Sequence, residues 1–186
     1  MSFFTGKGDQ GTTKLFDSAK GVRVTKTSPI FEALGMLDEL NSLVGWCKPA
    51  TSELHVFETK QITDLLRAVQ DCLFTAQAEL AGAPKNIPEQ ETTSMSELIN
   101  TIEKSLPPVT TFLVAGGSEL SARLDIARSV SRRVERRVLA LHESGDREVA
   151  ASTRAYLNRL SSLLYALTRW VNHLEGITEA PPVYNN

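Results

Sequence analysis

Residues 124–137 read LDIARSVSRRVERR, and this stretch is the most informative part of the chain for its fold. Ala127, Val130 and Val134 recur at spacings of three and four residues, which places them on one face of an α-helix. Charged side chains occupy most positions between them, as expected where the opposite face meets water or a ligand. The pattern predicts a long amphipathic helix over residues 118–143, whose first residue, a serine, supplies the N-terminal cap.

Apolar residues keep a helical spacing along much of the remaining chain and indicate an all-α protein. Four further helices are predicted over residues 29–47, 52–80, 91–105 and 147–175. Pro49, the pair Pro107-Pro108 and Gly145 interrupt the pattern between helices. Five helices with short connections are typical of an antiparallel bundle. We expect one domain over residues 1–186, made of an N-terminal segment (1–28), the helical bundle (29–175) and a loose tail (176–186).

The overall composition disfavours several classes of protein. The 186 residues carry a formal net charge of −2, so no overall positive field would attract nucleic acid or an anionic membrane. Two cysteines and three histidines without metal-ligand spacing argue against a disulfide framework and against a metal site built from protein side chains. No apolar run approaches the length of a membrane span, and the start of the chain has no signal or transit pattern. We expect a soluble, cytoplasmic protein.

A glycine-rich segment precedes the first predicted helix. Residues 5–13 read TGKGDQGTT and nearly match two known phosphate-binding loops. Gly6, Gly8 and Gly11 fit the dinucleotide-binding pattern, but no strand precedes them. Thr12 stands where a P-loop needs its lysine. Because glycines let backbone N–H groups turn toward an anion, the segment is either an unconventional phosphate loop or a mobile terminal arm.

The polar face of the predicted fourth helix is rich in arginine. Three arginines and one glutamate recur at i, i+4, i+7 and i+8, so one helix face carries all four. They are Arg128, Arg132, Glu135 and Arg136. Guanidinium groups donate forked hydrogen bonds that suit carboxylates or a polyphosphate. A solvated face with i,i+3 and i,i+4 ion pairs is the alternative. An RNA-binding stripe is disfavoured by the net acidity and by the absence of interleaved aromatic residues.

Polar residues also interrupt the apolar stripes of two other helices. Asp38 lies one turn from Ser42 in the first helix, with Asn41 on the same flank. An unpaired buried carboxylate would be too costly, so Asp38 is either exposed or paired with an arginine. In the fifth helix Asn158 and Ser161 stand beside core leucines, where such side chains bind a ligand or bond locally to the backbone. Polar groups from three helices and a glycine-rich loop favour one site, at an end of the bundle or between subunits.

Four motifs, in this order and spacing, resemble those of a known family. ATP:corrinoid adenosyltransferases of the propanediol-utilisation type carry motifs similar to TGKGDQGTT, GMLDELNS, ARSVSRRVERRV and YLNRLSSLLYAL. The resemblance covers about residues 5–174. It implies a ferritin-like five-helix bundle that assembles as a homotrimer, with an active site at each subunit interface. The implied reaction transfers the 5′-deoxyadenosyl group of ATP to Co(I) of a reduced corrinoid, giving adenosylcobalamin and triphosphate.

The resemblance also implies roles for individual residues. Those expected around ATP are Thr5, Lys7, Gly8, Asp9, Gly11, Thr13, Lys26, Arg132, Glu135, Arg136 and Asn158. Asp38 and Arg128 are expected to form an acid–arginine pair between neighbouring subunits, on the corrinoid side of the site. Phe112 is expected to occupy the lower face of the corrin and to displace the lower axial ligand. Catalysis is thus expected to depend on Arg132, Phe112, Asp38 and Arg128.

Further expectations concern the cofactor and the partners. Mg²⁺ is expected to be held mainly by ATP phosphates and water, without protein ligands. The implied protein partners are a corrinoid reductase and an adenosylcobalamin-dependent mutase or dehydratase. The sequence departs from the family's usual residues at Gly6, Ala115, Asp125 and Ser162, and Ala115 and Asp125 lie near the expected corrinoid side. The alternatives are a non-catalytic sensor or delivery protein for ATP or adenosylcobalamin, and a structural or RNA-associated helical protein.

Overall fold

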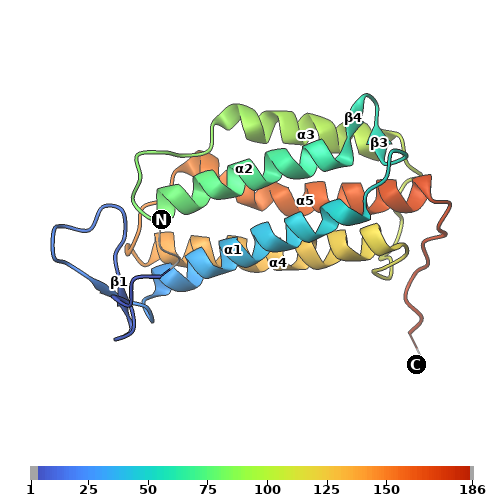
Figure 1. The fold of residues 1–186 in the computed structure, drawn as a ribbon. Coiled ribbons are helices and arrows are strands. Elements are labelled where there is room, and N and C mark those ends of the chain that lie inside the picture. Colours follow the sequence, from blue (N-terminus) through green and yellow to red (C-terminus); the bar gives the residue numbers. More distant parts are fainter. Residues whose placement is uncertain (1–3, 185–186) are drawn as a thin grey trace.

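A computed structural model describes residues 4–184 of the chain and contains, in that range, five α-helices. Their bounds are α1 Pro29–Cys47, α2 Ile62–Leu80, α3 Glu89–Lys104, α4 Glu119–Glu143 and α5 Ala151–Leu174. Successive helices alternate in direction and pack in the spatial order α2, α1, α4, α5, α3 (Figure 1). The predicted all-α, antiparallel five-helix bundle is confirmed. In the described part of the chain, no helix combines the length and apolarity that a membrane crossing requires.

The helix ends follow local signals in the sequence. Pro29 occupies the first turn of α1, where its missing N–H would have no helical partner. The 3₁₀ turn η1, Lys48–Ala50, follows α1 at the predicted break. Ser118 accepts a hydrogen bond from the Ser121 N–H at 3.3 Å, which confirms the predicted cap of α4. The end of α3 and the start of α4 leave residues 105–118 as a connecting segment at one end of the bundle.

The apolar stripes of the helices meet in one continuous core. Its largest fully buried side chains are Leu37, Leu40, Ile62, Leu66, Leu73, Leu80, Ile87, Ile102, Leu120, Leu124, Leu157 and Leu160. Each stabilises the fold by about 1.5–3 kcal/mol because its apolar surface leaves water. The three predicted packing residues of α4, Ala127, Val130 and Val134, are buried. Since these residues face the core, the arginines between them lie toward the outside of the bundle.

The second helix begins later than predicted. The apolar spacing predicts a helix over residues 52–80, but α2 begins at Ile62. Two short antiparallel strands precede it, β3 Val56–Phe57 and β4 Lys60–Gln61. Glu58, in the turn between them, has φ +53°, a left-handed conformation that an α-helix does not contain. The helices α1, α3 and α4 begin and end within two residues of their predicted bounds.

The packing of this hairpin explains the difference. Phe57 is buried, and its ring meets that of Trp170 in α5 edge-on, with centroids 4.9 Å apart. His55 is buried beside them, and its Nε2 lies 2.8 Å from a carboxylate oxygen of Glu175 at the end of α5. Contacts with a distant part of the chain therefore override the apolar spacing that favoured a longer helix.

The fifth helix also begins later, at Ala151 instead of the predicted residue 147. The buried carboxylate of Glu79 in α2 explains this start. One of its oxygens accepts a hydrogen bond from the Ala150 N–H at 2.7 Å, and the other accepts from the Thr153 hydroxyl. A carboxylate at this position satisfies a free N–H group of the first turn and lies at the positive end of the helix dipole.

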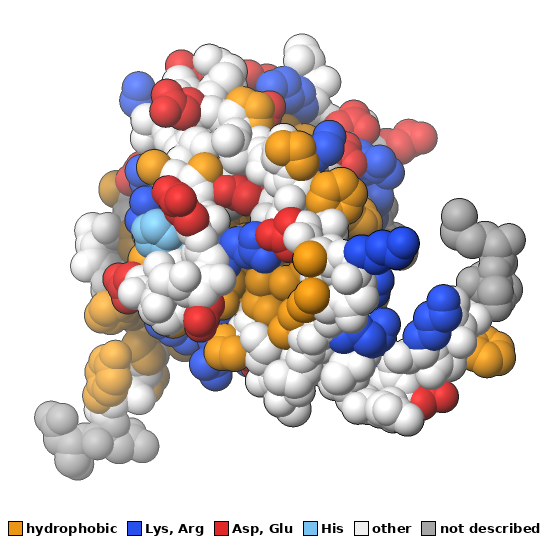
Figure 2. Space-filling model, turned by 90° about the vertical axis from the view of Figure 1, so that its left-hand side faces the viewer, with side chains coloured by type: hydrophobic (Ala, Val, Ile, Leu, Met, Phe, Trp, Pro, Cys, Tyr) orange, Lys and Arg blue, Asp and Glu red, His pale blue; other side chains and the backbone are white. Residues whose placement is uncertain are grey.

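The chain forms a small ladder before it enters the bundle. Strand β1, Thr12–Thr13, pairs with β2, Val24–Thr25, in antiparallel register. The Phe16 N–H donates to the Ala81 carbonyl at 2.8 Å, which attaches this segment to the end of the bundle where α2 finishes. Figure 1 shows the segment projecting beyond that end. Figure 2 views the same end face-on, with Lys and Arg side chains gathered along one of its sides.

Candidate active site

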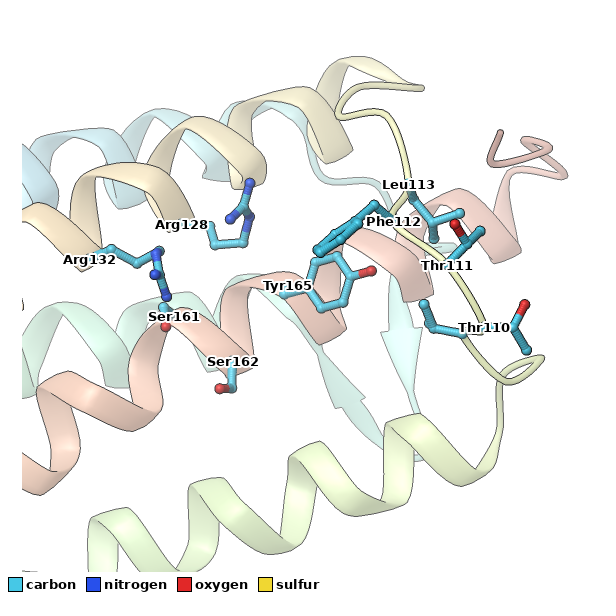
Figure 3. A pocket seen from close by; sticks show the side chains of 10 residues that line it. Thr110, Thr111, Phe112, Leu113, Arg128, Arg132, Ser161, Ser162 and Tyr165 are labelled. Atoms are coloured by element: carbon cyan, nitrogen blue, oxygen red, sulfur yellow. The ribbon is translucent and has the colours of Figure 1, made fainter. Parts of the chain in front are cut away.

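A cleft of about 800 Å³ lies between α4, α5 and the segment that connects α3 to α4. Arg128 and Arg132 line it from α4, and Phe112 lines it from the connecting segment. The other lining residues are Val109, Thr110, Thr111, Leu113, Ser161, Ser162 and Tyr165. Figure 3 shows the α4 arginines opposite the serines and the tyrosine of α5, with the 110–113 stretch at one end. The cleft thus combines cationic, hydroxyl-bearing and aromatic walls.

The predicted site arginines differ in their bonding. Arg128 donates from Nε to Asp125 Oδ1 at 2.7 Å. Arg132 and Arg136 are exposed and form no hydrogen bond or ion pair with any residue between 4 and 184. A guanidinium without a protein partner keeps all its donors available for an anionic ligand. The bonding favours a ligand site over a surface in which ion pairs use up the charges.

Glu135 and Asn158 connect α4 to α5 beside these arginines. Asn158 donates from Nδ2 to Glu135 Oε1 at 2.6 Å. Arg132 lies one turn before Glu135, and Arg136 lies next to it on α4. The structure therefore brings the four helical residues predicted for the nucleotide onto one exposed strip across α4 and α5.

Phe112 stands on the connecting segment with its side chain turned largely to solvent, since 82% of the residue is exposed. Hydrogen bonds to its backbone groups hold the segment in place. Arg169 donates from both Nη atoms to the Pro107 carbonyl at 3.2 Å, and the Val114 N–H donates to the Ala180 carbonyl at 2.9 Å. The C-terminal tail, expected to be loose, is thus bonded to the segment at its Ala180. An exposed ring on an anchored backbone can lie against a flat ligand without repacking the core.

Arg23, which was not predicted as a site residue, holds the glycine-rich segment together. Arg23 donates from Nε to Thr12 Oγ1 at 2.9 Å. Its Nη2 donates to the carbonyls of Lys7 at 2.8 Å and Thr12 at 2.6 Å. A Cβ added to Gly8 would stand 3.1 Å from the Lys26 Nζ, so the ammonium lies close to the glycine backbone. The structure thus gathers the predicted phosphate residues of the segment and Lys26 into one unit.

Within one copy of the chain, the glycine-rich segment and Phe112 lie at opposite ends of the helical bundle (Figure 1). Asp17 is held by Arg147, which donates to its carboxylate at 2.6 Å just after α4 ends. Phe112 comes just before α4 begins. The 25 residues of α4 span about 37 Å at 1.5 Å per residue. Among residues 4–184 no hydrogen bond or ion pair joins residues 5–26 to α4.

Asp38 is exposed on α1 and forms no hydrogen bond or ion pair with another residue in the range 4–184. Its neighbour Glu39 is paired with Arg133 of α4 at 3.1 Å. Arg128, the predicted partner of Asp38, is bonded to Asp125 of its own chain. Since the Asp38–Arg128 pair is predicted between subunits, it stays a prediction.

Tyr165 of α5 lines the cleft but was not predicted as a site residue. Its ring centroid lies 6.0 Å from the guanidinium carbon of Arg128. Partial burial raises the pKa of the Tyr165 hydroxyl, while the positive charge of Arg169 opposes the shift. The hydroxyl therefore stays protonated at neutral pH and remains a hydrogen-bond donor. A tyrosine among leucines at helical spacing is typical of a core residue, so no signal in the sequence set Tyr165 apart.

The model of a known family, described as cobalamin adenosyltransferase, matches residues 3–171. This chain belongs to the cobalamin adenosyltransferase family. Corrinoid adenosyltransferase PduO of Citrobacter freundii is 39% identical in an alignment 180 residues long that covers 93% of this chain and 50% of that protein. Corrinoid adenosyltransferase of Bacillus subtilis is 34% identical in an alignment 181 residues long that covers 95% of this chain and 90% of that protein. This family member therefore spans about half the length of the first relative and nearly all of the second.

Solved structures agree with this family membership. A variant of the PduO-type ATP:corrinoid adenosyltransferase from Lactobacillus reuteri, complexed with cobalamin and ATP, superposes with a TM-score of 0.86 at 27% identity, over 100% of both chains. Another variant, complexed with ATP, gives a TM-score of 0.84 at 27% identity, over 98% of this chain and 100% of that one. The family predicted from four motifs is confirmed. The roles of the individual site residues remain predictions.

Proposed function

We propose that this protein transfers the 5′-deoxyadenosyl group of ATP to the Co(I) centre of a reduced corrinoid, forming adenosylcobalamin and triphosphate. One observation carries the proposal: Arg132, without a protein partner in the described chain, lines the same cleft as the exposed Phe112. The arginine suits a leaving triphosphate, and the ring suits the flat face of a corrin. The ATP and cobalamin in a solved relative support the same pair of substrates.

The reaction needs no nucleophile from the protein. Co(I) donates an electron pair to C5′ of ATP, so a cobalt–carbon bond forms as the C5′–O5′ bond breaks. Triphosphate leaves with the electrons of the broken bond. The protein has to align C5′ with cobalt and to stabilise the charge that gathers on the triphosphate. Arg132 and Arg136 are proposed to bind that charge, while Glu135 and Asn158 hold the rest of the nucleotide.

Phe112 is proposed to act on the corrinoid before the transfer. In Co(II) a lower axial ligand shares the orbital that must receive the next electron, so loss of the ligand raises the reduction potential. A phenyl ring can fill the place of that ligand but cannot coordinate cobalt. The 82% exposure of Phe112 leaves the ring available for this contact.

The glycine-rich segment is proposed to close over the nucleotide phosphates. Backbone N–H groups and the Lys26 ammonium would meet the phosphate oxygens. The residues of the segment proposed for this role are Thr5, Lys7, Gly8, Asp9, Gly11 and Thr13. The three hydrogen bonds from Arg23 to Lys7 and Thr12 support the proposal, because they give the segment a defined shape before any ligand binds.

We further propose that neighbouring copies complete the site in a homotrimer. Within one chain the glycine-rich segment and Phe112 lie at opposite ends of α4. A second copy would bring its own segment to α4 and its exposed Asp38 to Arg128. Mass measurement in solution tests this assembly: a particle of three 20.4 kDa chains is expected, and a fully active monomer would refute it.

Mg²⁺ is proposed to arrive with the nucleotide. Across residues 4–184 no three His, Cys, Asp or Glu side chains are grouped so that they could hold a metal ion. We therefore propose that the ion stays on the ATP phosphates and keeps several waters. No step of the reaction is assigned to it. We place the protein in the cytoplasm, with a corrinoid reductase that supplies Co(I) and a mutase or dehydratase that uses the product.

An anaerobic assay tests the proposed function. Purified protein is mixed with chemically reduced corrinoid and ATP with Mg²⁺, and the absorbance change on alkylation of cobalt is followed together with triphosphate release. Equal amounts of adenosylated corrinoid and triphosphate are expected. Saturable ATP binding without either product would instead identify a non-catalytic binding protein.

A further inference from the structure

Asp125 links the arginine wall of the cleft to the segment that carries Phe112. The residue is buried in the first half of α4, with 9% of its surface exposed. Its Oδ1 accepts a hydrogen bond from Arg128 Nε at 2.7 Å, and its Oδ2 accepts one from the Gly116 N–H at 3.2 Å. Both oxygens of one carboxylate are thus used, one by an arginine that lines the cleft and the other by the connecting segment.

On the segment side, the bond to Gly116 holds a turn that only glycine accommodates well. Gly116 and Gly117 have φ of +113° and +134°. Asn172 of α5 donates from Nδ2 to the Gly116 carbonyl at 3.3 Å. The N–H of Gly116 is therefore held from α4 and its carbonyl from α5. Because the exposed ring of Phe112 has little packing of its own, its position depends on the anchors of its segment, and this turn four residues later is one of them.

On the helix side, the same carboxylate orients Arg128. Only Nε of the guanidinium is bonded, and within the described chain the two Nη groups have no hydrogen-bond or ion-pair partner. Because the guanidinium is planar, a fixed Nε also fixes the direction in which both Nη groups point. Arg128 lines the cleft, so its free donors are turned to a defined place in it.

We propose that Asp125 is a positioning residue that sets Arg128 and the Phe112 segment relative to each other. Asp125 does not line the cleft and acts through these two groups. The proposal rests on the proposed function, because it assigns both groups to the corrinoid side of that site. It also explains the choice of side chain. Asparagine has one acceptor oxygen, so its NH₂ would face one of the two donors that aspartate satisfies.

Hydrogen–deuterium exchange in the ligand-free protein tests the anchoring without any need for activity. In Asp125→Ala, which removes both acceptors, the bonded amides of Val114 and Gly116 are expected to exchange about tenfold faster or more, a factor that corresponds to about 1.4 kcal/mol. Exchange in residues 5–26 should stay unchanged. Glu119→Gln is the matched control, because it removes another carboxylate bonded to an arginine on α4, Arg123. Asp125→Asn, which keeps one acceptor oxygen and adds a donor, serves if the alanine variant does not fold.

Kinetics test the second half of the proposal. With Co(II) corrinoid, a reductant and ATP, Asp125→Asn is expected to lower kcat about tenfold or more, because misplaced groups lose alignment. The KM for ATP should stay within about twofold, since Asp125 makes no bond to Arg132, Arg136 or Asn158. Unchanged exchange at Val114 and Gly116 in Asp125→Ala, or a kinetic loss that appears mainly in the KM for ATP, overturns the proposal. If the unaltered protein transfers no adenosyl group, the proposed function fails, and the exchange result still decides whether Asp125 anchors the segment.

Discussion

Glu135 of α4 and Asn158 of α5 are joined by a 2.6 Å hydrogen bond that connects the two helices beside Arg132. The bond occupies one carboxylate oxygen with a neutral donor. Arg132 and Arg136, which flank that carboxylate on α4, remain without a bonded partner among residues 4–184. The neutral amide of Asn158 adds no negative charge beside these arginines, so their donors stay open to an anionic ligand.

Asn158→Asp is expected to weaken ATP binding more than Asn158→Ala. The aspartate would place a second carboxylate beside Glu135, repel the phosphates and attract the free arginines. A cost of about 1.4 kcal/mol corresponds to a tenfold rise in the KM for ATP relative to the alanine variant. Steady-state kinetics with saturating corrinoid measure the difference. Equal KM values in the two variants would remove the electrostatic role given to this bond.

Arg132→Ala is expected to lower kcat about 100-fold or more while the bundle stays folded, because loss of one preorganised donor to a leaving group has effects of that size. Arg132 is exposed and has no bonded partner in residues 4–184, so the melting temperature should hardly change. Arg137→Ala is the matched control, since Arg137 is also exposed on α4 and is not among the residues lining the cleft. A similar loss in both variants would point to overall charge instead of a specific contact.

Phe112→Ala is expected to leave ATP binding intact and to abolish turnover that starts from Co(II). Turnover from chemically prepared Co(I) should survive, because the electron has already been delivered. Val114→Ala is the control: Val114 lies on the same segment, 58% exposed, and its side chain does not line the cleft. Rates with Co(II) plus reductant are compared with rates from Co(I). Normal Co(II) turnover in Phe112→Ala would exclude the role proposed for the ring.

Gly117→Ala is expected to destabilise the protein by about 2–5 kcal/mol, the sum of a left-handed backbone penalty and overpacking. A Cβ at this position would stand 2.3 Å from Asn172 Oδ1 and 2.9 Å from Ser121 Oγ. Gly176→Ala has the backbone penalty alone, since its φ is +67° and nothing lies within 4 Å of the added atom. Its expected cost is about 1–2 kcal/mol. Denaturant unfolding of both variants gives the comparison, and equal costs would show that the contact with Asn172 relaxes freely.

The bundle could be predicted because its signals are local. The stripe Ala127, Val130 and Val134 and the Ser118 cap lie within one helix and need no partner to be recognised. The hairpin before α2 could not be predicted, because its strands are two residues long and too short to show alternation. The predicted start of α5 was wrong for a similar reason. Glu79, far away in the sequence, accepts the hydrogen bond from the Ala150 N–H at the point where the helix begins.

The candidate site, like the fold, could be predicted only in part. Helical spacing predicted the shared face of the α4 arginines, and the resemblance to the family indicated Phe112 and Asn158. Neither could show that Arg23 holds the glycine-rich segment, since its three bonds depend on a ladder only two residues deep. The link from Asp125 to Gly116 was equally hidden, because it requires a turn with two positive φ angles in succession.

The separation of the glycine-rich segment from Phe112 along one chain has a genetic consequence. Where each catalytic unit draws on two polypeptides, an allele damaged at Lys26 and an allele damaged at Phe112 can complement each other. In a mixed oligomer, the intact glycine-rich segment of one variant would lie against the intact Phe112 end of the other variant. A cell that carries both alleles regains activity that neither allele supports alone.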